Sequence, residues 1–230
     1  MNRGFLRCTP FVLFIAMLLP HGSSADVTPS SDGEPPSVAS KPVNAGNTAK
    51  MLEHFRQMAA SGYHYEETRV LELVEAPWHG SGYLLTDADG TLVKLQLAPE
   101  RIIMAITAQR MYYYAAAQGQ RYSAPLDFSD PMIAQVGTLR AVLQGHTAEL
   151  YAAYDIAVDQ RDTEWLLRLT GKSSANAGLL LEVSGDDAKP QRKIIIRQPD
   201  GEKSEYRMMP ASERQIGTNV ARLLTEAAGE

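Results

Sequence analysis

Apolar residues recur at two different spacings along residues 48–209, and each spacing predicts one kind of secondary structure. Three- and four-residue spacing between a capping position at Asn47 or Thr48 and a stop at Gly62 predicts an opening helix. A second helical region is expected from Ser129 to about Tyr154, with a break at Gly145. The apolar positions of the two regions are Met51, Leu52, Phe55, Met58, Ala59, Ile133, Val136, Leu139, Leu143, Leu150 and Tyr154.

Segments rich in Tyr, Val, Ile, Leu and Thr predict two groups of five strands, one after each helical region. They are expected at 63–75, 82–86, 91–97, 101–107 and 110–116, and at 156–158, 164–170, 179–183, 193–197 and 204–209. An antiparallel sheet of about ten strands is large enough to curl, and two amphipathic helices fit its concave side. We therefore expect one α+β domain over 48–209. Apolar residues at helical spacing in 210–230 predict a loosely attached terminal helix.

The N-terminus has the three parts of a cleavable signal peptide, which predicts export. Arg3 and Arg7 precede a nine-residue apolar run at 11–19, and small residues at 23–25 offer a cleavage site. An uncleaved membrane anchor is the weaker interpretation, because a spanning helix needs about 20 residues. The single cysteine, Cys8, lies before the apolar run, so we expect neither lipidation at the cleavage point nor a disulfide. Residues 26–47 are rich in proline and serine and are expected to be a disordered linker.

The net charge of the chain argues against a nucleic-acid partner. The chain has a net charge of −5, and loss of the leader removes two arginines and no acids, which gives −7. Because lysine and arginine supply most of the affinity for phosphate backbones, we expect no nucleic-acid partner.

The sequence contains no catalytic motif that we recognise, so no catalytic residue, metal or cofactor is predicted. It has no Gly-x-Ser-x-Gly elbow, no phosphate-binding glycine loop and no His-Glu-x-x-His pair. Asp186 and Asp187 fall in a predicted turn, where aspartate is common for structural reasons. Beyond the leader the histidines lack ligand spacing and are expected in surface or turn roles; they are His54, His64, His79 and His146.

The first predicted strand contains a charged pair in an unusual position. Glu67 and Arg69 share odd parity with Tyr65 and Leu71, so in a regular strand all four lie on one face. A bulge or an edge position would turn the pair to water, as is usual for charged residues. The alternative is a pair that lines an apolar cavity and meets a lipid head group. Lys94 is a weaker candidate, because the apolar face of its own strand points the other way.

Many short segments together resemble the outer-membrane lipoprotein carrier family, LolA, and especially its divergent LolA-related branch. The segments are residues 63–73, Ala76-Pro77, Ser81 to Leu84, Leu92 to Lys94, Ala98 to Glu100, Leu139 to Gly145, Trp165 to Leu169 and Asp200 to Ser204. The resemblance covers about 48–209 and depends on the order and spacing of many weak matches. One departure concerns the turn after the second strand, where Ala88 stands in place of an arginine that latches the lid in the lipoprotein carriers. Another acylated lipid is therefore a serious alternative to lipoprotein as cargo.

The resemblance implies a half-open antiparallel β-barrel closed by a helical lid, and a periplasmic carrier that binds acyl chains. The expected partners are an acylated lipid or lipoprotein cargo, an inner-membrane donor complex and an outer-membrane acceptor, with the carrier itself a monomer. A lipid-sensing module that acts on an envelope regulator is the alternative, and a lipid-modifying enzyme is the least favoured class. Glu67 and Arg69 are the polar candidates. The expected cavity residues are Met51, Leu52, Phe55, Tyr65, Leu71, Leu73, Leu84, Leu95, Tyr113, Leu139, Leu143, Trp165 and Leu167.

Overall fold

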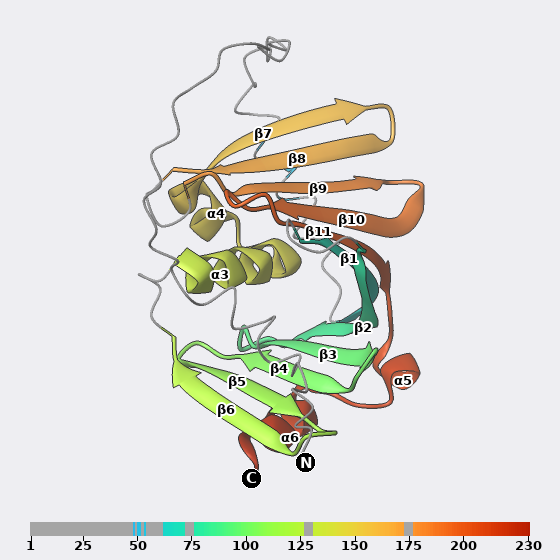
Figure 1. Cartoon of the computed structure of the whole chain (residues 1–230). Coiled ribbons are helices and arrows are strands. Elements are labelled where there is room, and N and C mark those ends of the chain that lie inside the picture. The colour runs from blue at the N-terminus through green and yellow to red at the C-terminus, as the bar shows by residue number, and fades with distance from the viewer. Residues whose placement is uncertain are drawn as a thin grey trace, which may run out of the picture. The chain divides into compact units, whose positions relative to one another are not determined.

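The computed structural model describes residues 48, 50, 51, 53, 62–71, 76–126, 131–172 and 177–230, all within the compact unit Val43–Glu230 (Figure 1). The predicted signal peptide and linker lie outside the described residues. Of the predicted opening helix, positions 48, 50, 51 and 53 are helical, and the remaining positions are not described.

The described strands form one antiparallel sheet of eleven strands. The first six are β1 (Gly62–Val70), β2 (Trp78–Thr86), β3 (Leu92–Ala98), β4 (Ile102–Ile106), β5 (Arg110–Ala115) and β6 (Gln120–Pro125). The other five are β7 (Tyr154–Arg161), β8 (Glu164–Gly171), β9 (Leu180–Asp186), β10 (Lys189–Arg197) and β11 (Lys203–Pro210).

Two meanders meet at the pairing of β1 with β11, and β6 and β7 are the two edges of the sheet. The sheet is therefore open rather than closed, which confirms the half-open barrel expected from the sequence (Figure 1). The strand count differs by one, because Gln120–Pro125 is a strand where none was predicted. That edge strand is mostly exposed and has no buried residue, so it lacks the apolar alternation that reveals other strands.

Helices α3 (Pro131–Gln144) and α4 (Thr147–Ala153) lie on the inner face of the curved sheet, between its two halves (Figure 1). Val142 and Leu143 of α3 and Leu150 of α4 belong to one buried cluster with side chains from β1, β2 and β8 to β11. Thr138 of α3 is also hydrogen-bonded to Tyr154 at the start of β7. None of the helices that the structure describes has the length and apolarity to cross a membrane.

The outer face of the same sheet has a second apolar cluster, formed with the C-terminal residues. Helix α5 (Glu213–Ile216) leads to α6 (Val220–Ala228), which lies against β3, β4 and β5. Its Val220, Leu223 and Ala227 are buried in one cluster with side chains of β2, β3 and β4. Asn219 caps α6 by accepting a hydrogen bond from the backbone of Arg222 at 2.9 Å. The prediction that the terminal helix is loosely attached is wrong, because this apolar stripe is buried.

Candidate functional site

Glu67 and Arg69 point toward the inner face of the sheet and are 1% and 6% exposed. Strand β1 pairs with β2 on one side and β11 on the other, and neither register shifts. The pair is thus not at an edge or a bulge, and the interpretation that turned it to water is wrong. Because β1 is paired on both sides, its side chains alternate strictly between the two faces of the sheet, and every odd-numbered residue of the strand lies on one face.

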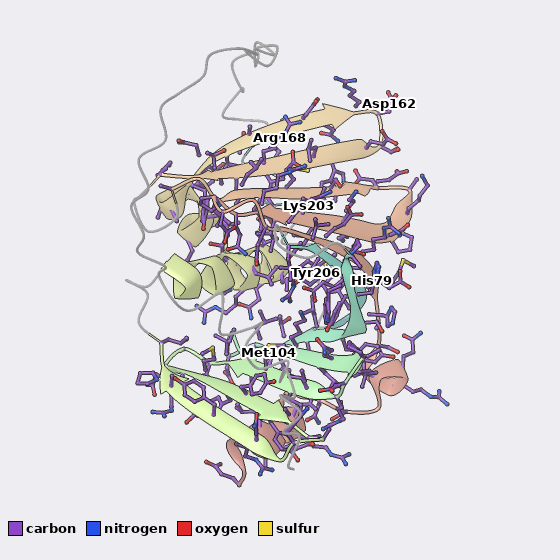
Figure 2. All side chains as sticks on the ribbon, viewed as in Figure 1. His79, Met104, Asp162, Arg168, Lys203 and Tyr206 are labelled. Atoms are coloured by element: carbon purple, nitrogen blue, oxygen red, sulfur yellow. The ribbon has the colours of Figure 1, made fainter. Side chains whose placement is uncertain are left out.

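The Glu67 carboxylate is the centre of a hydrogen-bonded cluster built from three strands. Arg69 donates to Glu67 Oε1 from Nε at 2.9 Å and from Nη2 at 2.7 Å. The hydroxyl of Tyr206 on β11 donates to the same oxygen at 2.8 Å. Lys94 on β3 donates to Oε2. Tyr206 lies in the interior between the two halves of the sheet (Figure 2).

Aromatic rings surround both cations of this cluster. The Lys94 ammonium lies 5.1 Å from the centroid of Tyr65 and 5.2 Å from that of Tyr206. The Arg69 guanidinium lies 5.0 Å from the centroid of Trp78. Gly80 permits this arrangement, because a Cβ there would lie 2.2 Å from the Trp78 ring. Ring faces attract cations, so they offset part of the cost of burying them.

Electrostatics keep Glu67 ionised despite its burial. Burial alone would raise the pKa of this carboxyl, but the charges and hydrogen bonds of Lys94 and Arg69 lower it from 4.5 to about 2. Burial lowers the pKa of the Lys94 ammonium, and the neighbouring Glu67 opposes that shift. Burial raises the pKa of Tyr65 and of Tyr206, and the Glu67 charge adds to it. At neutral pH the cluster therefore joins an ionised carboxylate to neutral phenols and the two basic side chains.

Lys94 is a full member of the cluster, although the sequence marked it as a weak candidate. The sequence predicts that its neighbour Leu95 faces the cavity, yet Leu95 and Val93 both pack in the outer cluster with α6. Lys94 therefore points inward, as the alternation requires. The opposite charges of Lys94 and Glu67 are visible in the sequence and could have suggested an ion pair. Only the order of the strands in the sheet shows that β3 lies two strands from β1, close enough for that pair to form.

The predicted cavity residues divide into four groups. Six belong to the inner apolar cluster: Met51, Tyr65, Leu84, Leu143, Trp165 and Leu167. Three others are not members of this cluster. Leu139 is partly buried and packs against it. Tyr113 is buried on β5 as the cross-strand partner of Met104, and Leu71 is half-buried just after the end of β1. Leu95 lies on the outer face, so its assignment to the cavity is corrected. Leu52, Phe55 and Leu73 lie outside the described residues.

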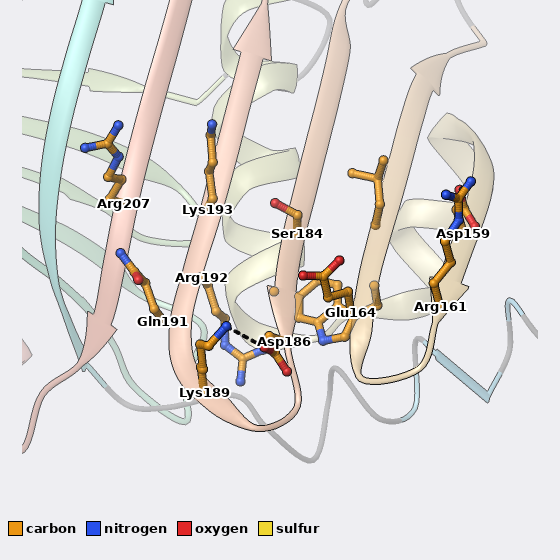
Figure 3. Close-up of a pocket in the computed structure, with 13 residues that line it drawn as sticks. Asp159, Arg161, Glu164, Ser184, Asp186, Lys189, Gln191, Arg192, Lys193 and Arg207 are labelled. Atoms are coloured by element: carbon orange, nitrogen blue, oxygen red, sulfur yellow. Dashed lines mark ion pairs between the residues drawn. The ribbon is translucent and has the colours of Figure 1, made fainter. Parts of the chain in front are cut away.

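A separate hollow of about 700 Å³ opens around the ends of β8, β9 and β10 (Figure 3). Its lining includes Lys189 and Asp186, which form an ion pair at 2.8 Å, together with Arg161 and Glu164. Trp165 contributes to both this hollow and the inner cluster. Among the residues that line this hollow only Trp165 and Leu166 are large and apolar, which does not suit an acyl chain, so we place the candidate site on the inner face, beside the larger apolar cluster.

The residues considered for chemistry from the sequence have local structural contacts. Asp187 accepts a hydrogen bond from the Trp165 indole at 2.9 Å. The His64 ring packs edge-on against the Tyr83 ring, with the two ring centroids 5.5 Å apart. The Nδ1 atom of His79 lies 3.2 Å from the Thr68 hydroxyl oxygen. His146 lies 3.5 Å from Glu149, and His54 is outside the described residues. Within the described part of the chain no three His, Cys, Asp or Glu side chains gather as metal ligands.

Comparison with known proteins gives similarities to solved structures only. No family profile and no curated protein matches the chain. It is similar to a LolA superfamily protein from Nitrosomonas europaea, at 12% identity and a TM-score of 0.37, over 72% of this chain and 94% of that one. A domain named as an outer membrane lipoprotein-sorting protein, from Vibrio parahaemolyticus, has 9% identity and a TM-score of 0.40, over 72% and 91%.

A third similar structure is a chain of the MucA/MucB complex of Pseudomonas aeruginosa. It has 14% identity and a TM-score of 0.38, and the match covers 76% of this chain and 62% of that one.

Proposed function

We propose that this protein is a non-enzymatic carrier that binds acyl chains between the inner face of its sheet and helices α3 and α4. The observation that carries the proposal is the inner cluster, in which α3 and α4 share one apolar core with both halves of the sheet. An amphipathic helix pair on an open sheet can separate from it without breaking any strand pairing. The space that the helices vacate would be lined by apolar side chains, which is the environment an acyl chain requires.

Burial energetics support reversible binding. Each CH₂ group transferred from water to an apolar site gains about 0.8 kcal/mol, so a C16 chain gains on the order of 10 kcal/mol before the costs of ordering. Leu143 and Leu150 are buried in the inner apolar cluster, on the surface where the lipid would lie. The helices and the lipid then compete for one apolar surface, which lowers the net affinity and permits transfer to an acceptor.

The N-terminal segment supports a location in the bacterial envelope. A cleaved leader without a lipid-modified cysteine would release a diffusing shuttle, with an inner-membrane donor and an outer-membrane acceptor as its partners. Lipoprotein and other acylated lipids both remain candidate cargoes, since an apolar cavity selects mainly for chain volume.

The test is an organic extract of protein purified from its native envelope, analysed by mass spectrometry, together with titration of a fluorescent fatty acid. We expect co-purified acyl lipid and saturable binding of the probe. Protein that carries no lipid and ignores the probe would overturn the proposal. If a pull-down then recovered a stable protein partner, the lipid-sensing module would become the better explanation.

A further inference from the structure

We propose that the buried cluster of Glu67, Arg69, Lys94, Tyr65 and Tyr206 is a head-group site that selects an anionic acyl ligand, with a carboxylate or phosphate at one end. This inference rests on the proposed function, because it assigns a head-group class to the same acyl site. The acyl site would then select its cargo by the charge of the head group as well as by the volume of the chain.

The first support is the limited charge pairing of Lys94. Its ion-pair partner Glu67 also pairs with Arg69, and among the described residues Lys94 has no other ion pair. Glu202 also interacts with Arg69, but it is only half-buried and accepts a hydrogen bond from Gln198 at 3.1 Å. Buried charges are stable only when they are paired. A second anion beside Lys94 would complete the pairing.

The second support is unused hydrogen-bonding capacity. The Tyr65 side chain is fully buried, and no described residue makes a hydrogen bond to its hydroxyl. A buried hydroxyl without a partner is costly, and such groups are rare in folded proteins. Lys94 has three N–H donors and uses them on Glu67 and, at 3.4 Å, on Tyr206. An anionic oxygen could accept from both Lys94 and Tyr65.

The third support is the order of exposure within the cluster. The side chains of Lys94 and Arg69 are 11% and 7% exposed, whereas that of Glu67 is 0% exposed. The cations thus lie closer to solvent than the carboxylate that anchors them. An incoming anion can reach the cations without displacing Glu67, whose negative charge stays behind them.

The fourth support is continuity with the acyl site. Tyr65 and Tyr206 belong to the inner apolar cluster and also contact Lys94 with their ring faces. A ligand whose head group meets Lys94 therefore has apolar side chains directly beside it for its tail. This juxtaposition of charge and apolar surface matches an amphiphile rather than a free ion or a neutral hydrocarbon.

The test compares laurate, dodecyl phosphate and dodecanol, which share a C12 chain and differ in head group, by isothermal titration calorimetry at neutral pH. We expect both anions to bind at least about tenfold more tightly than the alcohol, as a charge-assisted hydrogen bond provides. Inorganic phosphate alone should not bind measurably, because it lacks a tail. Binding of phosphate as tight as that of dodecyl phosphate would instead identify an ion site and overturn the head-group assignment.

Two variants assign the selectivity to the cluster. Lys94→Met leaves Glu67 paired with Arg69, so the fold should persist, and it should bring the three C12 ligands to within about twofold of each other. Tyr65→Phe removes one hydroxyl, and it should reduce the preference for laurate and dodecyl phosphate over dodecanol by about tenfold or less. The matched control is Lys193→Met, which removes a charge that is 40% exposed and pairs with Glu205, and it should keep the full preference.

The outcomes separate this inference from the proposed function. If dodecanol binds wild-type protein as tightly as the two anions, the head-group site is refuted while acyl binding stands. If Lys94→Met retains the preference, the cluster is not its source. If none of the three C12 ligands binds, the acyl carrier itself is refuted.

Discussion

The Tyr206 hydroxyl donates a 2.8 Å hydrogen bond to Glu67 Oε1, although 139 residues separate the two in sequence. They are direct cross-strand partners on β11 and β1, the strands that join the two meanders. With Lys94 from β3, this bond ties the junction of the sheet to a buried charge. The site and the integrity of the sheet are thus coupled, and substitutions in the cluster should change both binding and stability.

Glu67→Gln should be strongly destabilising. The amide cannot neutralise Arg69 and Lys94, so two buried cations would lose their shared partner, at a cost of about 3–5 kcal/mol in the free energy of unfolding. Urea denaturation measures this change. The matched control is Glu66→Gln, one residue away on the exposed outer side of β1, which should stay within about 0.5 kcal/mol of wild type. Equal effects of the two variants would contradict a role for the buried ion pairs.

The stability that Glu67 supplies should depend on pH in a defined window. Its folded pKa, about 2, lies below the ordinary value of 4.5, so the folded state favours the ionised form. The contribution is therefore complete above about pH 5 and is lost as pH falls from 4.5 toward 2; it amounts to about 3 kcal/mol. Urea titrations of wild type and Glu67→Gln across this range should show the difference shrinking at acid pH. A constant difference would refute the depressed pKa.

Gly82→Ala should disrupt the pairing of β2 with β3. A Cβ at this position would lie 1.9 Å from the Leu95 carbonyl oxygen, which is backbone and cannot move aside alone. We expect a loss of about 2–3 kcal/mol in the free energy of unfolding, measured by thermal denaturation. Ser81→Ala, at the adjacent half-buried position, is the control and should change little. A neutral Gly82→Ala would show that the two strands are more widely separated than described.

Leu223→Ala should reveal α6 as an integral part of the fold. Leu223 is 1% exposed between α6 and the outer face of the sheet, and truncation of a buried leucine costs about 2–5 kcal/mol. Thr225→Ala on the exposed side of α6 should remain within about 0.5 kcal/mol of wild type. Chemical denaturation distinguishes the two variants. If Leu223→Ala were as stable as wild type, α6 would be a loose tail after all.

Leu143→Ala should bind acyl ligands more tightly even though it is less stable. Leu143 holds α3 in the inner cluster, so its truncation weakens the closed arrangement that competes with the lipid. We expect the Kd for a fluorescent fatty acid to fall by at least about threefold. Glu149→Gln, exposed on α4, should leave the Kd unchanged. Weaker binding by Leu143→Ala would mean that Leu143 contacts the ligand rather than competing with it.

Sequence reasoning located Glu67 and Arg69 by parity alone, because alternation in a regular strand is a local property. It missed the position of Lys94 and misplaced Leu95, because both faces of β3 are covered and an apolar face does not indicate which core it enters. It also missed Tyr206, whose partner on β1 is distant in the chain. The edge strand Gln120–Pro125 was missed because it buries no residue.

The sequence by itself determined most of the local features: the second helical region, the terminal helix, ten of the eleven described strands and the apolar faces that had to be buried. These follow from side-chain periodicity and turn chemistry, which act over a few residues. Only the tertiary structure decided which apolar face meets α3 and α4 and which meets α6, and only it brought Lys94 and Tyr206 to Glu67. Those contacts depend on the pairing of β1 with β11 and on the curl of the sheet, which no local pattern encodes.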